Sequence, residues 1–160
     1  MQKILLIGSG GSGKSTLARE LGARLGIDVH HLDALLWKPN WTPATRQEQI
    51  ATQSALIERD SWIIDGNYGG TLDLRVDAAD TIVFLDLPRT VCTYRVLKRM
   101  LKYRGKTRPD MGPGCEERFD PKFLKWVRSR SDQPFYNVYT NLNPKKTLFS
   151  CVHGPRSVVS

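Results

Sequence analysis

The chain has 160 residues, enough for one compact domain with a hydrophobic core. Hydrophobic residues make up 40% and charged residues 25%, as in ordinary globular proteins, and no apolar run approaches the roughly 20 residues that span a bilayer. The short apolar run at 1–7 leads into Gly-rich sequence where a signal peptide would need a cleavage site. We therefore expect a cytoplasmic protein with no membrane partner.

The positive charge is concentrated in one segment. Residues 88–130 hold thirteen of the 24 Lys and Arg residues but only four of the 16 Asp and Glu residues. Clustered charge of one sign repels itself unless an anion is bound part of the time. A solvated helix face is the simplest interpretation, and nucleotide phosphates or nucleic acid are the candidate anionic partners.

The three cysteines do not indicate a metal site. Cys92, Cys115 and Cys151 are scattered, and no C-x-x-C pair is present for zinc. We predict three free thiols.

Short apolar runs alternate with helical patterns along the chain. The sequence predicts strands at 3–7, 27–32, 62–64, 81–85 and 147–152. It predicts helices at 14–25, 44–60, 89–104, 116–130 and 132–142, with loops at 37–43 and 105–114. This alternation indicates a three-layer α/β fold with a five-stranded parallel sheet, in a single domain spanning 1–160.

A phosphate-binding loop follows the first strand. The pattern G-x-x-x-x-G-K-[ST] is matched at every fixed position between an apolar strand and a helix, and we predict nucleotide-binding residues at Gly8, Ser9, Gly10, Gly11, Ser12, Gly13, Lys14, Ser15 and Thr16. Glycines let successive backbone N–H groups point at phosphate oxygens, and the helix dipole favours an anion. Lys14 is the predicted catalytic cation on the phosphates, and Ser15 a Mg²⁺ ligand. The sequence therefore predicts a P-loop NTPase fold that binds ATP and Mg²⁺.

Several P-loop classes do not fit the rest of the chain. A GTPase should carry an N-K-x-D segment, which is absent, and a motor ATPase needs a longer chain. The remaining pattern is similar to small kinases such as adenylate, shikimate and gluconate kinases. In that branch the acceptor lies over the carboxyl ends of the second and third strands, and a basic lid closes over the phosphates.

Four blocks give a closer resemblance. Residues 31–39, 62–68, 71–75 and 103–112 resemble bacterial DNA topology modulation proteins, an adenylate-kinase-like P-loop family. The resemblance runs from the N-terminus to about Trp126 and fades after residue 130. The sequence type implies a kinase, whereas the family name implies an effect on DNA.

Carboxylates follow three of the predicted strands. Asp33 ends the second strand, where an acceptor should bind, although it could instead cap the next helix. Asp65 ends the third strand, which favours a role in holding Mg²⁺ and substrate over a simple turn residue. Asp86 is a competing metal carboxylate, or a cap of the basic helix.

Other polar and aromatic residues are candidates for substrate binding. Asn67 follows Asp65, and Arg75 resembles the arginine that small kinases place on an acceptor phosphate. A surface salt bridge of Arg75 with Asp73 or Asp77 is the alternative. Aromatic residues that could stack on a ring, although such residues more often lie in a core, are Trp37, Trp41, Tyr68 and Trp126.

The basic segment contains the candidate lid. Arg99, Arg104 and Arg108 are predicted catalytic cations of a lid-like insertion at about 95–114, because phosphoryl transfer depends on cation clamps. Glycines and prolines between 105 and 114 suit hinges. A solvated basic helix face and loop are the alternative.

Two functions are consistent with the sequence. The favoured one is an ATP-dependent phosphotransferase whose small-molecule acceptor is a nucleotide, a nucleoside or another hydroxylated molecule. The alternative is a DNA-interacting regulator with an ATP switch, in which the basic segment contacts DNA phosphates. No DNA-reading motif is visible in the sequence, so DNA is the less favoured partner.

Overall fold

A central parallel sheet organises the molecule. The computed structural model describes residues 1–129 and 147–152. Within these ranges the main sheet has five parallel strands in the order β2-β5-β1-β6-β7. The strands are β1 (Lys3–Gly8), β2 (Val29–His31), β5 (Trp62–Asp65), β6 (Thr81–Asp86) and β7 (Thr147–Val152). The predicted α/β fold with a five-stranded parallel sheet is confirmed.

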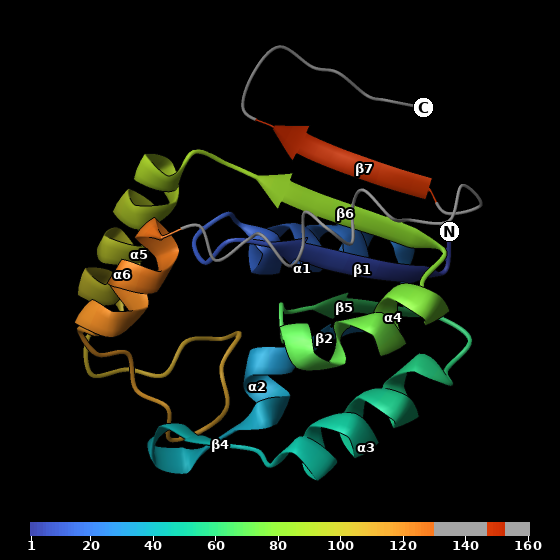
Figure 1. The fold of residues 1–160 in the computed structure, drawn as a ribbon, viewed down its shortest axis with the longest axis horizontal. Coiled ribbons are helices and arrows are strands. Elements are labelled where there is room, and N and C mark those ends of the chain that lie inside the picture. Colours follow the sequence, from blue (N-terminus) through green and yellow to red (C-terminus); the bar gives the residue numbers. More distant parts are fainter. Residues whose placement is uncertain (130–146, 153–160) are drawn as a thin grey trace.

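Helices cover both faces of this sheet. They are α1 (Lys14–Leu25), α2 (Leu32–Leu36), α3 (Arg46–Ile57), α4 (Leu72–Ala78), α5 (Arg89–Lys102) and α6 (Pro121–Arg128). A small second sheet pairs β3 (Trp37–Lys38) with β4 (Thr42–Pro43) around a 3₁₀ turn at Pro39–Trp41, and another 3₁₀ turn at Gly69–Thr71 precedes α4. In Figure 1 the arrowheads of β6 and β7 point toward the end of the sheet where α5 and α6 lie.

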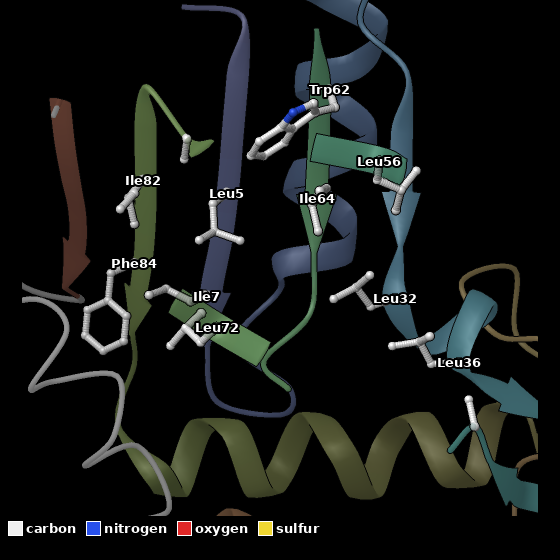
Figure 2. Close-up of a cluster of buried hydrophobic side chains, with 12 residues drawn as sticks. Leu5, Ile7, Leu32, Leu36, Leu56, Trp62, Ile64, Leu72, Ile82 and Phe84 are labelled. Carbon is white, nitrogen blue, oxygen red and sulfur yellow. The ribbon is translucent and has the colours of Figure 1, made fainter. Parts of the chain in front are cut away.

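Alternating side chains of the buried strands build two cores. On one face Leu5, Ile7 and Ile64 pack with residues of α2, α3 and α4, as Figure 2 shows around Trp62. On the other face Ile4 and Leu6 pack with residues of α1, α5 and α6. This is the period-two alternation of a strand buried on both faces, and it produces the three layers.

The structure differs from the predicted elements at several boundaries. Leu32 begins α2, so the second strand ends at His31 and Asp33 lies in the first turn of a helix. The helix predicted at 116–130 begins only at Pro121, because the Asp120 carboxylate accepts the backbone N–H groups of Lys122 and Phe123. Helix α4 was not predicted, and the helix predicted at 132–142 lies outside the described residues.

The segment around the predicted lid divides into two parts. Residues 95–102 belong to α5, which packs into the core through Val96 and Met100. Residues 103–118 form a loop that folds back on itself, with isolated bridges that pair Arg104 with Glu117 and Thr107 with Glu116. A lid at 95–114 stays a prediction, but only the second part has the loop geometry expected of one. Among the described residues, no helix has the length and apolar character needed to cross a bilayer.

Gly22 should be required for the packing of α1 on the sheet. A Cβ added there would lie 2.4 Å from Val29 Cγ2 and 3.0 Å from the Ile27 carbonyl oxygen. We expect Gly22→Ala to destabilise the protein by about 1–3 kcal/mol in urea unfolding, despite the better helix propensity of alanine. Gly69→Ala is the matched control, because nothing lies within 4 Å of the added atom. Equal stability of the two variants would contradict this packing.

Candidate functional site

The phosphate loop joins β1 to α1 in a tight curve. Gly13 has φ 99° at the N-terminus of α1, and Gly8 has φ 144° with its Cα facing the Leu85 carbonyl oxygen, 2.5 Å from where a Cβ would lie. Only glycine adopts these conformations without strain. Lys14 Nζ donates to the carbonyl oxygens of Gly8 and Ser9, both at 2.8 Å. The backbone carbonyl groups of the loop thus hold the Lys14 ammonium group close to the loop.

A large cavity opens from this loop. Its volume is about 1010 Å³, and residues 10–16 of the loop and first helical turn form one wall. The carboxyl ends of β2 and β5 contribute Asp33, Asp65, Asn67 and Tyr68, and α5 contributes Arg95 and Arg99. The structure therefore brings most of the predicted site residues to a single cavity, in line with the strand-end rule.

Asp65 is a buried carboxylate at the end of β5. It is 5% exposed, and its Oδ2 lies 3.0 Å from His31 Nδ1 at the end of β2. Burial raises the pKa of Asp65, but the His31 hydrogen bond, the Lys14 charge and the Ser15 hydroxyl together outweigh it and hold the pKa below its usual value. The carboxyl group is therefore ionised at neutral pH. His31 was not predicted as a site residue.

The structure separates Asp65 from its competitor. Asp86 ends β6, is exposed, and does not line the cavity. Asp65 Oδ1 is buried and makes no hydrogen bond within the described residues. An unpaired carboxylate oxygen beside the Ser15 hydroxyl suits a Mg²⁺ ion bound through water, so the residues fit the metal predicted from the sequence. In the described part of the chain, no group of three or more His, Cys, Asp or Glu side chains has the geometry to hold a metal ion.

Asp33 lies on the floor of the cavity with a different environment. The Tyr68 hydroxyl donates to its Oδ1 at 3.0 Å. Burial and the nearby Asp65 charge raise the pKa of Asp33, although Tyr68, Arg108 and Lys14 oppose the shift. The two carboxyl groups therefore have pKa values displaced in opposite directions, an arrangement that is typical of groups with different chemical tasks.

Arg75 and Asn67 contact the protein backbone. Arg75 is fully buried in α4, and it donates to the carbonyl oxygens of Gly66 at 2.5 Å, Asn67 at 2.7 Å and Tyr68 at 3.0 Å. It does not line the cavity, so the structure does not bring this predicted substrate ligand to the site. Neither Asp73 nor Asp77 is among its hydrogen-bond partners. Asn67 does line the cavity, and its Oδ1 accepts the Gly8 N–H at 3.2 Å.

The predicted lid arginines have different positions. Arg99 and Arg108 line the cavity, whereas Arg104 is exposed and does not. Arg108 Nε lies 2.7 Å from Glu117 Oε2, and Arg99 Nε lies 3.6 Å from the same oxygen. Arg95 is a cavity cation that was not predicted, and its NH1 donates to the Ser12 carbonyl oxygen at 3.4 Å. One turn separates Arg95 from Arg99 on α5, and this spacing was a signal for it in the sequence.

Aromatic side chains form much of the remaining wall. Trp37, Trp41, Tyr68 and Trp126 all line the cavity, so each of the four aromatic candidates lies at the site. Trp37 and Trp41 meet edge to face with ring centroids 5.7 Å apart, and Trp126 stacks on Phe123. Sequence alone could not distinguish these positions from core positions.

Comparison with solved structures assigns the fold. The chain matches a shikimate kinase from Acinetobacter baumannii with a TM-score of 0.59 and 14% identity, over 99% of this chain and 86% of that one. It matches a gluconokinase from Sinorhizobium meliloti with a TM-score of 0.54 and 17% identity, over 96% and 84%. YorR protein from Bacillus subtilis, solved in complex with phosphorylated GDP, matches with a TM-score of 0.55 and 17% identity, over 96% and 87%.

Sequence comparisons add no family assignment. No family model matches the chain, and no curated protein matches it either. The resemblance to DNA topology modulation proteins therefore stays a prediction. At these identities the structural matches establish the fold alone, an α/β fold that the chain shares with a shikimate kinase and a gluconokinase.

Proposed function

We propose that this protein is a phosphotransferase that moves the γ-phosphate of ATP to a hydroxyl group of a small-molecule acceptor. The single observation that carries the proposal is that one cavity contains both the phosphate loop and the carboxyl ends of β2 and β5. Lys14 lies near enough to Asp33 to influence its pKa. A donor phosphate held by Lys14 would thus lie beside an acceptor held by Asp33.

The chemistry needs little beyond this arrangement. The acceptor oxygen forms a bond to the γ-phosphorus, the bond from that phosphorus to the bridging oxygen of ADP breaks, and the hydroxyl proton passes to the Asp33 carboxylate. A carboxyl group whose pKa is raised accepts a proton more readily near neutral pH. Lys14 and Arg95 contact the backbone of the phosphate loop, and these two cations would stabilise the charge on the transferring oxygens. Arg99 lines the same cavity but lies 3.6 Å from Glu117.

Ser15 and Asp65 are the residues that would hold Mg²⁺ with the nucleotide. The metal would neutralise phosphate charge when bound. The His31 hydrogen bond holds Asp65 through Oδ2, and Oδ1, which makes no hydrogen bond within the described residues, is the oxygen that would be offered to the metal.

DNA binding receives no support from the comparisons. The matched proteins are named as kinases of small molecules or as a nucleotide complex, including a deoxyadenosine kinase from M. mycoides with bound dATP. Arg95, Arg99, Arg108 and Arg118 of the basic segment line the cavity, a position that suits a small substrate better than a DNA backbone. The phosphotransferase therefore accounts for part of the charge excess.

Lys14→Ala should lose triphosphate affinity while the protein stays folded. Hydrogen bonds to a charged group contribute about 1.5–3 kcal/mol, so we expect Kd for Mg·ATP to rise about 10- to 100-fold in calorimetric titration. Lys102→Ala, an exposed lysine of α5, is the control and should bind normally. Unchanged affinity in folded Lys14→Ala protein would exclude the phosphate loop as the donor site.

Asp65→Asn should lower turnover far more than Asp86→Asn. The amide keeps the size of Asp65 but removes the charge that would hold the metal, so we expect kcat to fall about 10- to 100-fold or more. ADP release, measured with the acceptor that gives the highest rate, compares the two variants. If Asp86→Asn abolishes activity while Asp65→Asn does not, the metal assignment is wrong.

Asp33→Asn should lower turnover and raise stability. Because the folded-state pKa of Asp33 is raised, the native state holds a proton that the unfolded state releases, and stability falls as pH rises from the unfolded toward the folded pKa. The Asn side chain does not titrate, so the variant lacks this loss of stability with rising pH. We expect urea unfolding of Asp33→Asn to show a gain over wild type that is larger at pH 7 than at pH 4. A loss of stability at pH 7 would contradict the raised pKa.

A further inference from the structure

The acceptor end of the cavity is built by two loops that meet. The 103–118 loop lies against the β3–β4 hairpin, where Asn40 N donates to the Gly114 carbonyl oxygen at 3.0 Å. Trp41 Nε1 donates to the Glu116 carbonyl oxygen at 2.9 Å, and Cys115 Sγ donates to the Lys38 carbonyl oxygen at 3.1 Å. These contacts place Trp37, Trp41 and Arg108 at the end of the cavity that also holds Asp33.

The arginines at this end are already paired with carboxylates. Arg108 is 7% exposed and lies 2.7 Å from Glu117 Oε2 and 3.2 Å from Asp110 Oδ2. Glu117 is itself 4% exposed, and its Oε2 also lies 3.6 Å from Arg99 Nε. Arg75, the other candidate for an acceptor anion, is buried against three backbone carbonyls.

An anionic acceptor would find the buried arginines at this end already neutralised. The carboxylates at this end are Asp33, Asp110 and Glu117. The exposed Arg118 also lines the cavity and lies 5.6 Å from the Trp41 ring, without a carboxylate partner among the described ion pairs. A carboxylate or phosphate that binds the buried Arg108 or Arg99 would have to displace Glu117 and leave that buried charge unpaired. Breaking a buried pair in this way is strongly disfavoured.

Two of the aromatic residues that line the cavity, Trp41 and Tyr68, have strained backbone conformations. Non-glycine residues of the described chain with positive φ are Asn40, Trp41 and Tyr68, at 61°, 58° and 34°. Two of these are aromatic residues that line the cavity. Bulky residues rarely adopt such conformations, and strain of this kind clusters at ligand-binding positions. The backbone is bent where it presents Trp41 and Tyr68 to a ligand.

We propose that the acceptor is an uncharged hydroxylated molecule with a flat ring, of the nucleoside class, and neither a carboxylate nor a phosphate ester. The ring packs among Trp37, Trp41 and Tyr68, and a hydroxyl group reaches Asp33. Stacking on these faces is available to any flat base, while the Glu117–Arg108 pair excludes the anionic analogue. This inference rests on the proposed phosphotransferase function.

Matched acceptor pairs test the inference with wild-type protein and Mg·ATP. The panel contains the common ribo- and deoxyribonucleosides, their 5′-monophosphates, shikimate, gluconate, glucose and glycerol, with phosphorylated product detected by mass spectrometry. We expect kcat/KM for the preferred nucleoside to exceed that of its monophosphate at least 10-fold. A preferred substrate that is anionic, or neutral without a ring, overturns the inference and leaves the phosphotransferase standing. Phosphorylation of none of them, with ATP bound normally, overturns the inference and counts against the proposed function itself.

Two variants test the residues that the inference invokes. Glu117→Gln should shift the ratio of kcat/KM for monophosphate over nucleoside upward at least 5-fold, because Arg108 and Arg99 lose the carboxylate that they share. Glu116→Gln, at an exposed neighbour, should leave the ratio unchanged. Asp110→Asn serves if Glu117→Gln does not fold. Trp41→Gly removes the ring and tolerates the positive φ, so we expect a folded protein with a nucleoside KM raised at least 10-fold. Unchanged ratios and KM values would refute the assignment.

Discussion

The site depends on the parallel register that places a buried carboxylate at the end of β5. Asp65 pairs with His31 on one side and with Leu6 on the other, one pleat before the phosphate loop. A shift by one residue would turn the Asp65 side chain to the opposite face of the sheet. Burying this charge is tolerated because His31 and Lys14 come to it from the two neighbouring strands and their loops. The strand register therefore decides whether Asp65, His31 and the phosphate loop come together.

A second buried charge fixes the turn that follows. Burial lowers the pKa of Arg75 to about 10, and the guanidinium still carries its charge at neutral pH. Its donors bind the carbonyl oxygens of residues 66–68, which are then held in a turn where Tyr68 has φ 34°. The same turn directs Asn67 to the phosphate loop and Tyr68 to Asp33. Arg75 therefore acts by positioning two contacts that connect the donor and acceptor ends of the cavity.

The arginines of the basic segment have different surroundings, which its net charge does not indicate. Arg95 lies on α5 and donates to the Ser12 carbonyl oxygen of the phosphate loop. Arg99 and Arg108 lie against Glu117, and Arg108 also pairs with Asp110. Positive charge is thereby concentrated near the phosphates and cancelled near the acceptor. Such a gradient within one cavity favours a polyanionic donor next to an uncharged acceptor.

The sequence by itself determined the phosphate loop, the alternation of strands and helices, and the placement of Asp65 at a strand end, because these follow from local patterns. Asp33 also lines the cavity, but from the first turn of α2 and not from the end of a strand. Buried apolar runs, a glycine-rich turn and carboxylates at strand ends are read residue by residue. Only the tertiary structure decided the roles of Arg75, Arg104 and Glu117. A guanidinium can bind a ligand, a backbone carbonyl or a carboxylate, and these alternatives look alike in sequence. The choice among them depends on which distant segment lies against it, and here the packing of α4 under the 66–68 turn and of the 103–118 loop on the β3–β4 hairpin made that choice.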